Sequence, residues 1–241
     1  HQVPPASVTT WRDGKTTTAT YWTADFDSKI DISYEDALEV TKELIEAAVA
    51  RRLISERPLG SFLSGGYDST VVTAYMAKLM SEKVQTYSIG FHSAQFNEAH
   101  HAKQVASYLQ TNHHEEILRP DASLLVETIS HVLDQPFADS SIIPTYLLAE
   151  FARENLIVAL GGDGGDEVFG GYDRYLAAPI IQAINPILGV IKPSISVLKL
   201  SSLVTHRKFE RIRVQMSAKE SLSERYSSIM SLASPEEINL V

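Results

Sequence analysis

The feature that most constrains the fold is a regular alternation of short apolar runs with longer amphipathic stretches between residues 59 and 160. Short apolar runs are typical of strands buried on both faces, and a period of about 3.6 residues is typical of helices. Strands are expected at 59–63, 84–91, 114–118 and 156–160, and helices at 69–80, 97–110, 122–133 and 142–154. Strands that alternate with helices predict an α/β fold with a doubly wound parallel sheet, covered by helices on both faces.

A glycine loop follows the first predicted strand, in the run Ser64-Gly65-Gly66-Tyr67-Asp68-Ser69. Glycines let the backbone approach phosphate oxygens, and the N-terminus of the next helix supplies unpaired N–H groups and a partial positive charge. No lysine follows the glycines, so this is not a Walker loop. Asp68 beside a phosphate requires a cation between them, which implies magnesium. We predict a pyrophosphate-binding loop for ATP; the alternative is an ordinary strand–helix turn with Asp68 as its cap.

A second glycine-rich run follows the last predicted strand. Residues 161–172 contain six glycines and three acidic residues. Carboxylates on a glycine scaffold suit a hard cation, and their spacing does not follow the twelve-residue calcium loop. The carboxyl ends of parallel strands meet at one edge of a sheet, so Asp68 and Asp166 are expected to hold one magnesium ion between the β- and γ-phosphates. A flexible acidic loop is the alternative.

The two ends of the chain differ from the α/β region. Asp13-Gly14 between two β-rich runs predicts a hairpin, and Ser33 with Asp36 resembles a capping box at the start of a helix over 33–52. Beyond residue 175 the pattern is only helical. The chain begins at His1 rather than Met, which suggests an excised piece of a longer protein. The predicted domains are a hairpin piece over 1–30, an α/β domain over 31–175 and a truncated helical extension over 176–241.

Composition excludes several classes of function. The chain has 241 residues and a net charge of −9, and this acidic balance argues against nucleic acid as a partner. No stretch of about 20 apolar residues is present, so no membrane partner is expected. The absence of cysteine excludes disulfides, a thiol nucleophile and thiolate metal sites, and it fits a cytoplasmic location.

Four segments together resemble the synthetase domain of asparagine synthetases, within the pyrophosphate-loop ATP pyrophosphatases: residues 64–69, 88–91, 144–147 and 161–172. The resemblance implies an adenine-nucleotide α-hydrolase-like fold and a reaction in two steps. A carboxylate attacks the α-phosphorus of ATP to give an acyl-adenylate and pyrophosphate, and ammonia then displaces AMP. The hairpin resembles the end of a glutaminase domain, which is the partner expected in the full-length protein. A homodimer is left open.

The resemblance also assigns roles to individual residues. Asp166 joins Asp68 at magnesium, and Asp163 stands where the family carries a glutamate that is proposed as a base. Asp163 is shorter than that glutamate by one methylene. The residues implied to bind ATP and its pyrophosphate are Phe62, Leu63, Ser64, Gly65, Gly66, Asp68, Ser69, Ile89, Gly161 and Gly162.

Two departures from the family limit what the resemblance implies. Residues 134–141 contain no arginine that could clamp a second carboxylate, so acceptors other than aspartate stay open, and we expect aspartate or a related acid. The chain has no cysteine nucleophile, so ammonia comes from another domain or from solution. Two other functions stay open: another pyrophosphate-loop ligase acting on a nucleotide or RNA, and an ATP-binding module without turnover.

Two histidine pairs invite a metal interpretation that we do not favour. His100 and His101 are neighbours on a predicted helix and point about 100° apart, which is poor geometry for one ion. His114 is expected to open a strand, directly after His113. Surface histidines that add pH sensitivity near neutrality are the preferred interpretation.

Overall fold

The computed structural model describes residues 2–91, 99–118, 122–135, 137, 139, 141–172 and 175. Its strands are Ser7–Arg12 (β1), Lys15–Thr20 (β2), Leu59–Phe62 (β3), Gln85–Phe91 (β4), Asn112–Leu118 (β5) and Val158–Leu160 (β6). Its helices are Tyr34–Arg52 (α1), Tyr67–Leu79 (α2), Ala99–Leu109 (α3), Ala122–Val132 (α4), Ile142–Ala152 (α5) and Gly165–Phe169 (α6). The chain forms two compact units, residues 1–47 and 48–241. The predicted helical extension, 176–241, lies outside the described residues.

The first unit contains the predicted hairpin. Strands β1 and β2 pair antiparallel, and Asp13 and Gly14 both take the positive φ angles that suit a two-residue hairpin turn. Hydroxyl groups bond across the strands, from Ser7 to Thr20 at 3.1 Å and from Thr9 to Thr18 at 2.9 Å. The hairpin is therefore confirmed, whereas its origin in a glutaminase domain stays a prediction.

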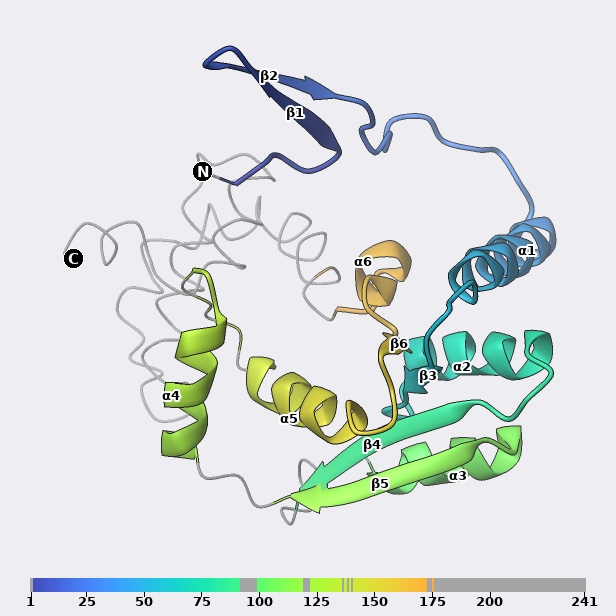
Figure 1. Ribbon diagram of the computed structural model, residues 1–241. Coiled ribbons are helices and arrows are strands. Elements are labelled where there is room, and N and C mark those ends of the chain that lie inside the picture. The colour runs from blue at the N-terminus through green and yellow to red at the C-terminus, as the bar shows by residue number, and fades with distance from the viewer. Residues whose placement is uncertain are drawn as a thin grey trace, which may run out of the picture. The chain divides into compact units, whose positions relative to one another are not determined.

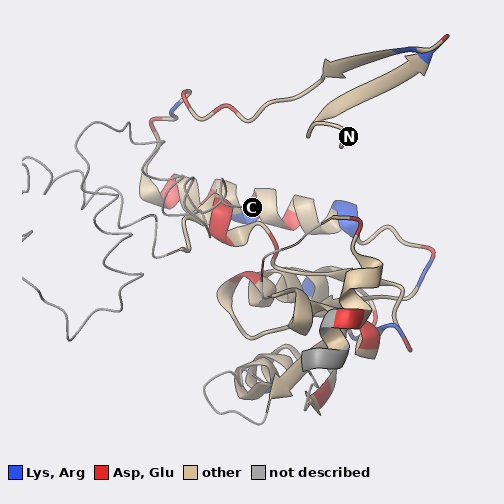
Figure 2. Ribbon diagram, turned by 90° about the vertical axis from the view of Figure 1, so that its left-hand side faces the viewer, with Lys and Arg blue, Asp and Glu red and all other residues tan. Residues whose placement is uncertain are grey.

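Helix α1 begins where the capping pattern predicts. The Asp36 N–H donates to Ser33 Oγ at 3.1 Å, and the Ser33 hydroxyl donates to the Asp36 carboxylate at 2.7 Å. Acidic residues occupy the first turn and Arg51 and Arg52 the last, an arrangement that complements the helix dipole (Figure 2). These local features explain why a helix with only one buried residue, Val49, still has defined ends.

The second unit is built on a parallel sheet with strand order β5-β4-β3-β6. The chain runs outward from β3 to β5 and then returns to add β6 on the other side of β3, which pairs Ser61 with Leu160. Strands β4 and β5 are thus added on one side of β3, and β6 is added on the other side. The topological switch point, where the direction of strand addition reverses, therefore lies between β3 and β6. Both glycine-rich runs leave the sheet at this point. The predicted parallel α/β fold is confirmed.

Helices cover both faces of the sheet (Figure 1). On one face, Leu63 packs against Ala102 and Ala106 of α3, and Ser61 Oγ lies 2.8 Å from Thr73 Oγ1 of α2. On the other face, α5 and the segment after it cover the strand side chains. The buried cluster there comprises Tyr87, Ala152 and Leu156, with Phe62, Leu148, Phe151 and Ala159 packed against it. This two-sided cover confirms the doubly wound arrangement.

Several details differ from the sequence expectation. Strand β6 begins at Val158, two residues later than predicted. Residues 165–169, predicted as part of a glycine-rich loop, form the short helix α6, because Gly164 turns the chain at φ +87° and its carbonyl accepts the Val168 N–H at 3.1 Å. Strand β5 begins two residues earlier than predicted, at Asn112, whose side chain bonds Gln85 Oε1 at 2.7 Å. Within the described part of the chain, none of the helices has the length and apolar character that a membrane span requires.

Candidate functional site

A cavity of about 430 Å³ lies at the carboxyl ends of β3, β4 and β6. Most of the predicted nucleotide residues line it, together with the predicted base: Phe62, Leu63, Ser64, Gly66, Asp68, Ser69, Ile89, Gly161, Gly162 and Asp163. Gly65 and Asp166 are not among the lining residues. Residues that are far apart in sequence therefore converge on one hollow at the switch point, where open α/β sheets bind their ligands.

The first glycine loop is folded onto the start of α2. Ser64 Oγ accepts the Gly66 N–H at 3.2 Å and lies 3.0 Å from Ser69 Oγ, which in turn accepts the Ser64 N–H at 3.3 Å. The N-cap residue Gly66 forms no side-chain cap. The first-turn N–H groups of α2 have no helical partner, so the helix presents donors and a partial positive charge beside the cavity.

Gly65 is the residue at which this loop packs closely against the main chain of α3. Its φ angle is +84°, and a Cβ placed on it would lie 2.6 Å from the Ala102 nitrogen and 2.7 Å from the His101 carbonyl carbon. Only glycine combines that backbone conformation with so close an approach to another main chain. The loop is therefore fixed against the first turns of α3 by a residue that does not itself line the cavity.

The second glycine loop touches the first at Asp68. A Cβ on Gly162 would lie 2.7 Å from the Ser69 nitrogen and 2.8 Å from Asp68 Cβ, and a Cβ on Gly165 would overlap the Asp68 carboxylate. The Asp163 carboxylate folds over Gly161, because a Cβ there would lie 2.8 Å from Asp163 Oδ2. The two loops thus meet without intervening side chains, and they place Asp68 and Asp163 in the same cavity wall.

Three carboxylates gather where the loops meet. Burial, and then the negative charges of Asp166 and Glu167, raise the pKa of Asp68 above its ordinary value. Asp166 lies in the first turn of α6, and its Oδ1 occupies the space that a Cβ on Gly171 would need. In the described residues, no lysine or arginine pairs with Asp68, so the local charge is strongly negative.

This donor set fits a magnesium ion that arrives with a nucleotide. Carboxylate oxygens are the protein ligands that magnesium prefers, and it usually takes its other ligands from phosphates and water. Asp68 and Asp166 are the residues that would hold it. Among the described residues, no group of three or more His, Asp or Glu side chains is placed to bind a metal by itself.

Several lining residues received no role from the sequence. Ser88, Phe91, Pro144 and Thr145 lie in segments that resemble the family, but nothing in their local pattern pointed to the cavity. Ala99, Ala102 and Leu148 lie on α3 and α5. Their place in the wall depends on how the helices pack, and small or apolar residues on a helix have no local signature of such a position.

An open parallel sheet with two glycine-rich loops at its switch point defines a class of α/β proteins that bind a ligand at the strand ends. Comparison with known sequences identifies the family. The family model described as asparagine synthase matches residues 40–236, and this chain therefore belongs to the asparagine synthase family.

Individual relatives agree with this assignment. Asparagine synthetase [glutamine-hydrolyzing] 1 of Bacillus subtilis is 34% identical over 177 residues, which are 72% of this chain and 28% of that protein. A relative in Methanocaldococcus jannaschii is 42% identical over 141 residues, covering 58% of this chain and 27% of its own length. The chain thus spans only about 27–28% of the length of these two relatives.

Solved structures show a weaker likeness. An NMN synthetase from Francisella tularensis matches with a TM-score of 0.38 and 15% identity, over 60% of this chain and 61% of that one. An NH3-dependent NAD synthetase from Campylobacter jejuni matches with a TM-score of 0.36 and 14% identity, over 87% of this chain and 92% of that one. Nothing about this chain follows from likenesses of that size.

Proposed function

We propose that this chain is the ATP-dependent, amide-forming part of an asparagine synthetase-like ligase. The observation that carries the proposal is the cavity at the switch point, lined by both glycine loops and by Asp68 and Asp163, in a chain of the asparagine synthase family. The substrates are ATP, a carboxylic acid and ammonia, and the products are an amide, AMP and pyrophosphate. The acid is aspartate or a close relative of it.

In this proposal the first step forms the acyl-adenylate. A carboxylate oxygen of the acceptor bonds to the α-phosphorus of ATP, and the bond from that phosphorus to the bridging oxygen breaks. The pyrophosphate leaves into the loop over residues 64–69, whose N–H groups and hydroxyls stabilise its charge. Magnesium held by Asp68 and Asp166 would supply further neutralisation of the phosphates.

The second step forms the amide. Ammonia bonds to the acyl carbon, the bond between that carbon and the AMP oxygen breaks, and a proton leaves the nitrogen. We assign this proton to Asp163, whose position in the cavity wall, on the opposite loop from the pyrophosphate cradle, supports that role. A base of this kind contributes roughly 10² to 10⁴ in rate.

Replacing Asp163 by asparagine is expected to separate the two steps. Asp163→Asn keeps the shape of the side chain but removes its basicity, so amide formation should fall by roughly 100-fold or more, whereas exchange between ATP and pyrophosphate should stay within about threefold. Both rates are measured on the same preparations. Asp163→Glu, which restores the residue typical of the family, is the matched control and should retain amide formation. Unchanged amide formation in Asp163→Asn contradicts the role.

The acceptor is identified by supplying it. The protein as it occurs in the cell is incubated with ATP, magnesium and ammonium together with one carboxylic acid from a panel that includes aspartate, and amide, AMP and pyrophosphate are quantified. One acid should yield the three products in equal amounts. ATP binding without AMP formation for every acid would favour a nucleotide-binding module without turnover. The segment 134–141, which sequence resemblance places at the acceptor, lies partly outside the described residues.

A further inference from the structure

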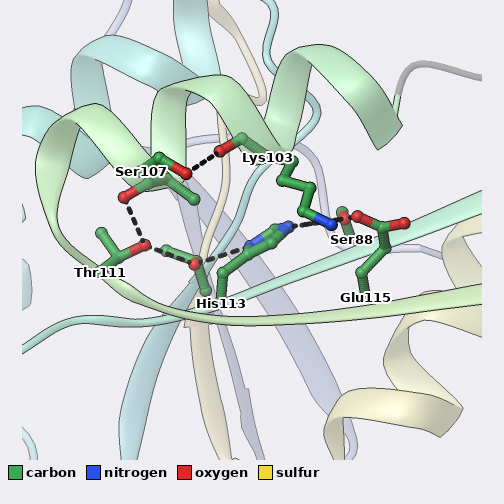
Figure 3. A network of polar contacts seen from close by, with 8 residues as sticks. Ser88, Lys103, Ser107, Thr111, His113 and Glu115 are labelled. Atoms are coloured by element: carbon green, nitrogen blue, oxygen red, sulfur yellow. Dashed lines mark hydrogen bonds and ion pairs between the residues drawn. The ribbon is translucent and has the colours of Figure 1, made fainter.

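A chain of hydrogen-bonded polar side chains runs from Thr111 through His113 to Ser88 (Figure 3). The imidazole ring of His113 on β5 lies between two hydroxyl groups of β4: its Nδ1 is 3.0 Å from Thr86 Oγ1 and its Nε2 is 3.3 Å from Ser88 Oγ. Thr86 Oγ1 is also 2.9 Å from Thr111 Oγ1, which donates to the Ala106 carbonyl at 3.5 Å. Thr86 is fully buried and Ser88 is 4% exposed.

The bond from Thr111 to the Ala106 carbonyl gives these hydrogen bonds a direction. Each hydroxyl has one proton, and the Ala106 carbonyl can only accept. If Thr111 donates to Ala106, then Thr86 donates to Thr111, His113 donates to Thr86 through Nδ1, and Ser88 donates to Nε2. Every proton of the network then has an acceptor within it. In the opposite direction Thr86 donates to Nδ1, the protonated Nε2 donates to Ser88, and the Ser88 hydroxyl donates into the cavity instead.

Ser88 is the point at which this network reaches the cavity, because it is one of the lining residues. We propose that His113 is a positioning residue of the nucleotide cavity: its neutral ring accepts the Ser88 proton and so leaves the Ser88 oxygen facing the ligand only as a hydrogen-bond acceptor. The ligand group beside Ser88 must then be a donor. This inference rests on the proposed function, because it concerns the nucleoside that the cavity would hold.

A nucleoside offers two kinds of donor, the ribose hydroxyls and the exocyclic amino group of adenine. Guanine and hypoxanthine carry an oxygen acceptor where adenine carries that amino group. If the base lies beside Ser88, a Ser88 oxygen that can only accept favours the amino group of adenine over a carbonyl group. If the sugar lies beside Ser88, the same oxygen favours ribose over deoxyribose. Matched nucleosides distinguish these two sources.

Protonation of His113 would reverse the Ser88 hydrogen bond, because both ring nitrogens of an imidazolium donate. Burial lowers the pKa of His113; Glu115 opposes this shift, whereas His114 and Lys103 add to it. Glu115 and His114 lie on β5 with His113, and Glu115 Oε2 is 4.0 Å from His113 Nε2. Lys103 comes from α3, which packs on that face (Figure 3). The neutral ring is therefore the form at pH 7. Nucleoside affinity should be complete above the pKa of His113 and should fall as the pH drops through it.

The tautomer is measured directly on the unaltered chain. Long-range proton–nitrogen correlation spectra of the imidazole rings, with the His113 signals assigned by their loss in His113→Gln, should show a protonated Nδ1 and an unprotonated Nε2 at pH 7.5. A protonated Nε2 at that pH overturns the proposal, whether or not any variant folds well.

The effect on binding is tested with adenosine, which has no phosphates and does not titrate between pH 5.5 and 8. The affinity of the unaltered chain for adenosine should fall as the pH drops from 7.5 through the pKa of His113, by about fivefold in full, the size of one hydrogen bond. His113→Gln, which cannot titrate, should have a flat profile, and Ser88→Ala should bind about fivefold more weakly and also with a flat profile. Inosine and the 2′- and 3′-deoxy analogues show which donor Ser88 accepts, because the pH dependence disappears for the analogue that lacks it.

His114→Gln is the matched control. His114 is the adjacent histidine, but it stacks on Tyr87 at 4.6 Å on the other face of the sheet and does not line the cavity. Its replacement should keep the pH dependence of adenosine binding and move the midpoint only upward, because His114 lowers the pKa of His113. Identical profiles for the unaltered chain and His113→Gln contradict this inference alone. Absence of ATP binding at every pH contradicts the proposed function, and this inference with it.

Discussion

Gly65→Ala is expected to destabilise the chain by about 2–4 kcal/mol, through two costs that add. A side chain at φ +84° is strained, and the new Cβ would lie 2.6 Å from the Ala102 nitrogen, where the obstacle is main chain that cannot rotate away. The loop must therefore move away from α3, and ATP affinity should fall as well. Unfolding in urea gives the free energy of unfolding, and calorimetry gives the affinity.

Gly164→Ala provides the matched control for this prediction. Gly164 has nearly the same angle, φ +87°, but a Cβ on it would meet nothing within 4 Å. It should cost only the backbone strain, about 1–2 kcal/mol. The difference between the two variants isolates the contact of the loop with α3. Equal losses of stability would show that this contact does not hold the loop in place.

Asp68→Asn should abolish the part of ATP affinity that depends on magnesium. Asparagine is a weaker ligand than a carboxylate and leaves Asp166 as the remaining proposed anionic ligand, so we expect a loss of roughly 100-fold, or about 2.8 kcal/mol. Titration of ATP with and without magnesium measures the loss. Without magnesium, the variant should bind ATP at least as well as the original chain, because the repulsion between Asp68 and the phosphates is gone.

The same substitution should not destabilise the fold. The raised pKa of Asp68 means that its ionised form is unfavourable in the folded chain, so removing the charge should leave the melting temperature at pH 7 equal or higher. A fall in affinity therefore cannot be attributed to unfolding. Glu127→Gln, which removes an exposed carboxylate of α4, is the control and should alter neither quantity. A magnesium-dependent affinity that survives in Asp68→Asn contradicts the assignment.

Much of the fold could be predicted because its signals are local. The apolar run at 84–91 and the Asp13-Gly14 turn each determine their own conformation, and the family resemblance agreed with them. Some boundaries of the strands and helices differ from the prediction. Strand β5 is at the edge of the sheet, where a polar residue such as Asn112 is tolerated. Its first residues therefore lack the apolar pattern that predicts a buried strand. Helix α6 depends on one residue, Gly164, at a left-handed φ angle that the sequence does not reveal.

The candidate site was predictable where the backbone itself is the functional element. Glycines in the two loops and their carboxylates could be recognised from composition and position after strands. His113 could not, because its partners Thr86 and Ser88 are 27 and 25 residues away in sequence and meet it only through the parallel pairing of β4 and β5. Side chains that act through such pairing have no local signature, which is why its preferred interpretation was an ordinary surface histidine.

The most direct test of ATP-dependent carboxylate activation is the exchange of labelled pyrophosphate into ATP, measured on the protein as it occurs in the cell, with magnesium, in the absence of ammonia. Exchange should appear only when a suitable carboxylic acid is present and should be lost in Asp68→Asn. It should persist in Asp163→Asn, whose defect lies in the second step. ATP binding at the cavity together with no exchange for any acid would contradict the adenylation of a carboxylate by this chain.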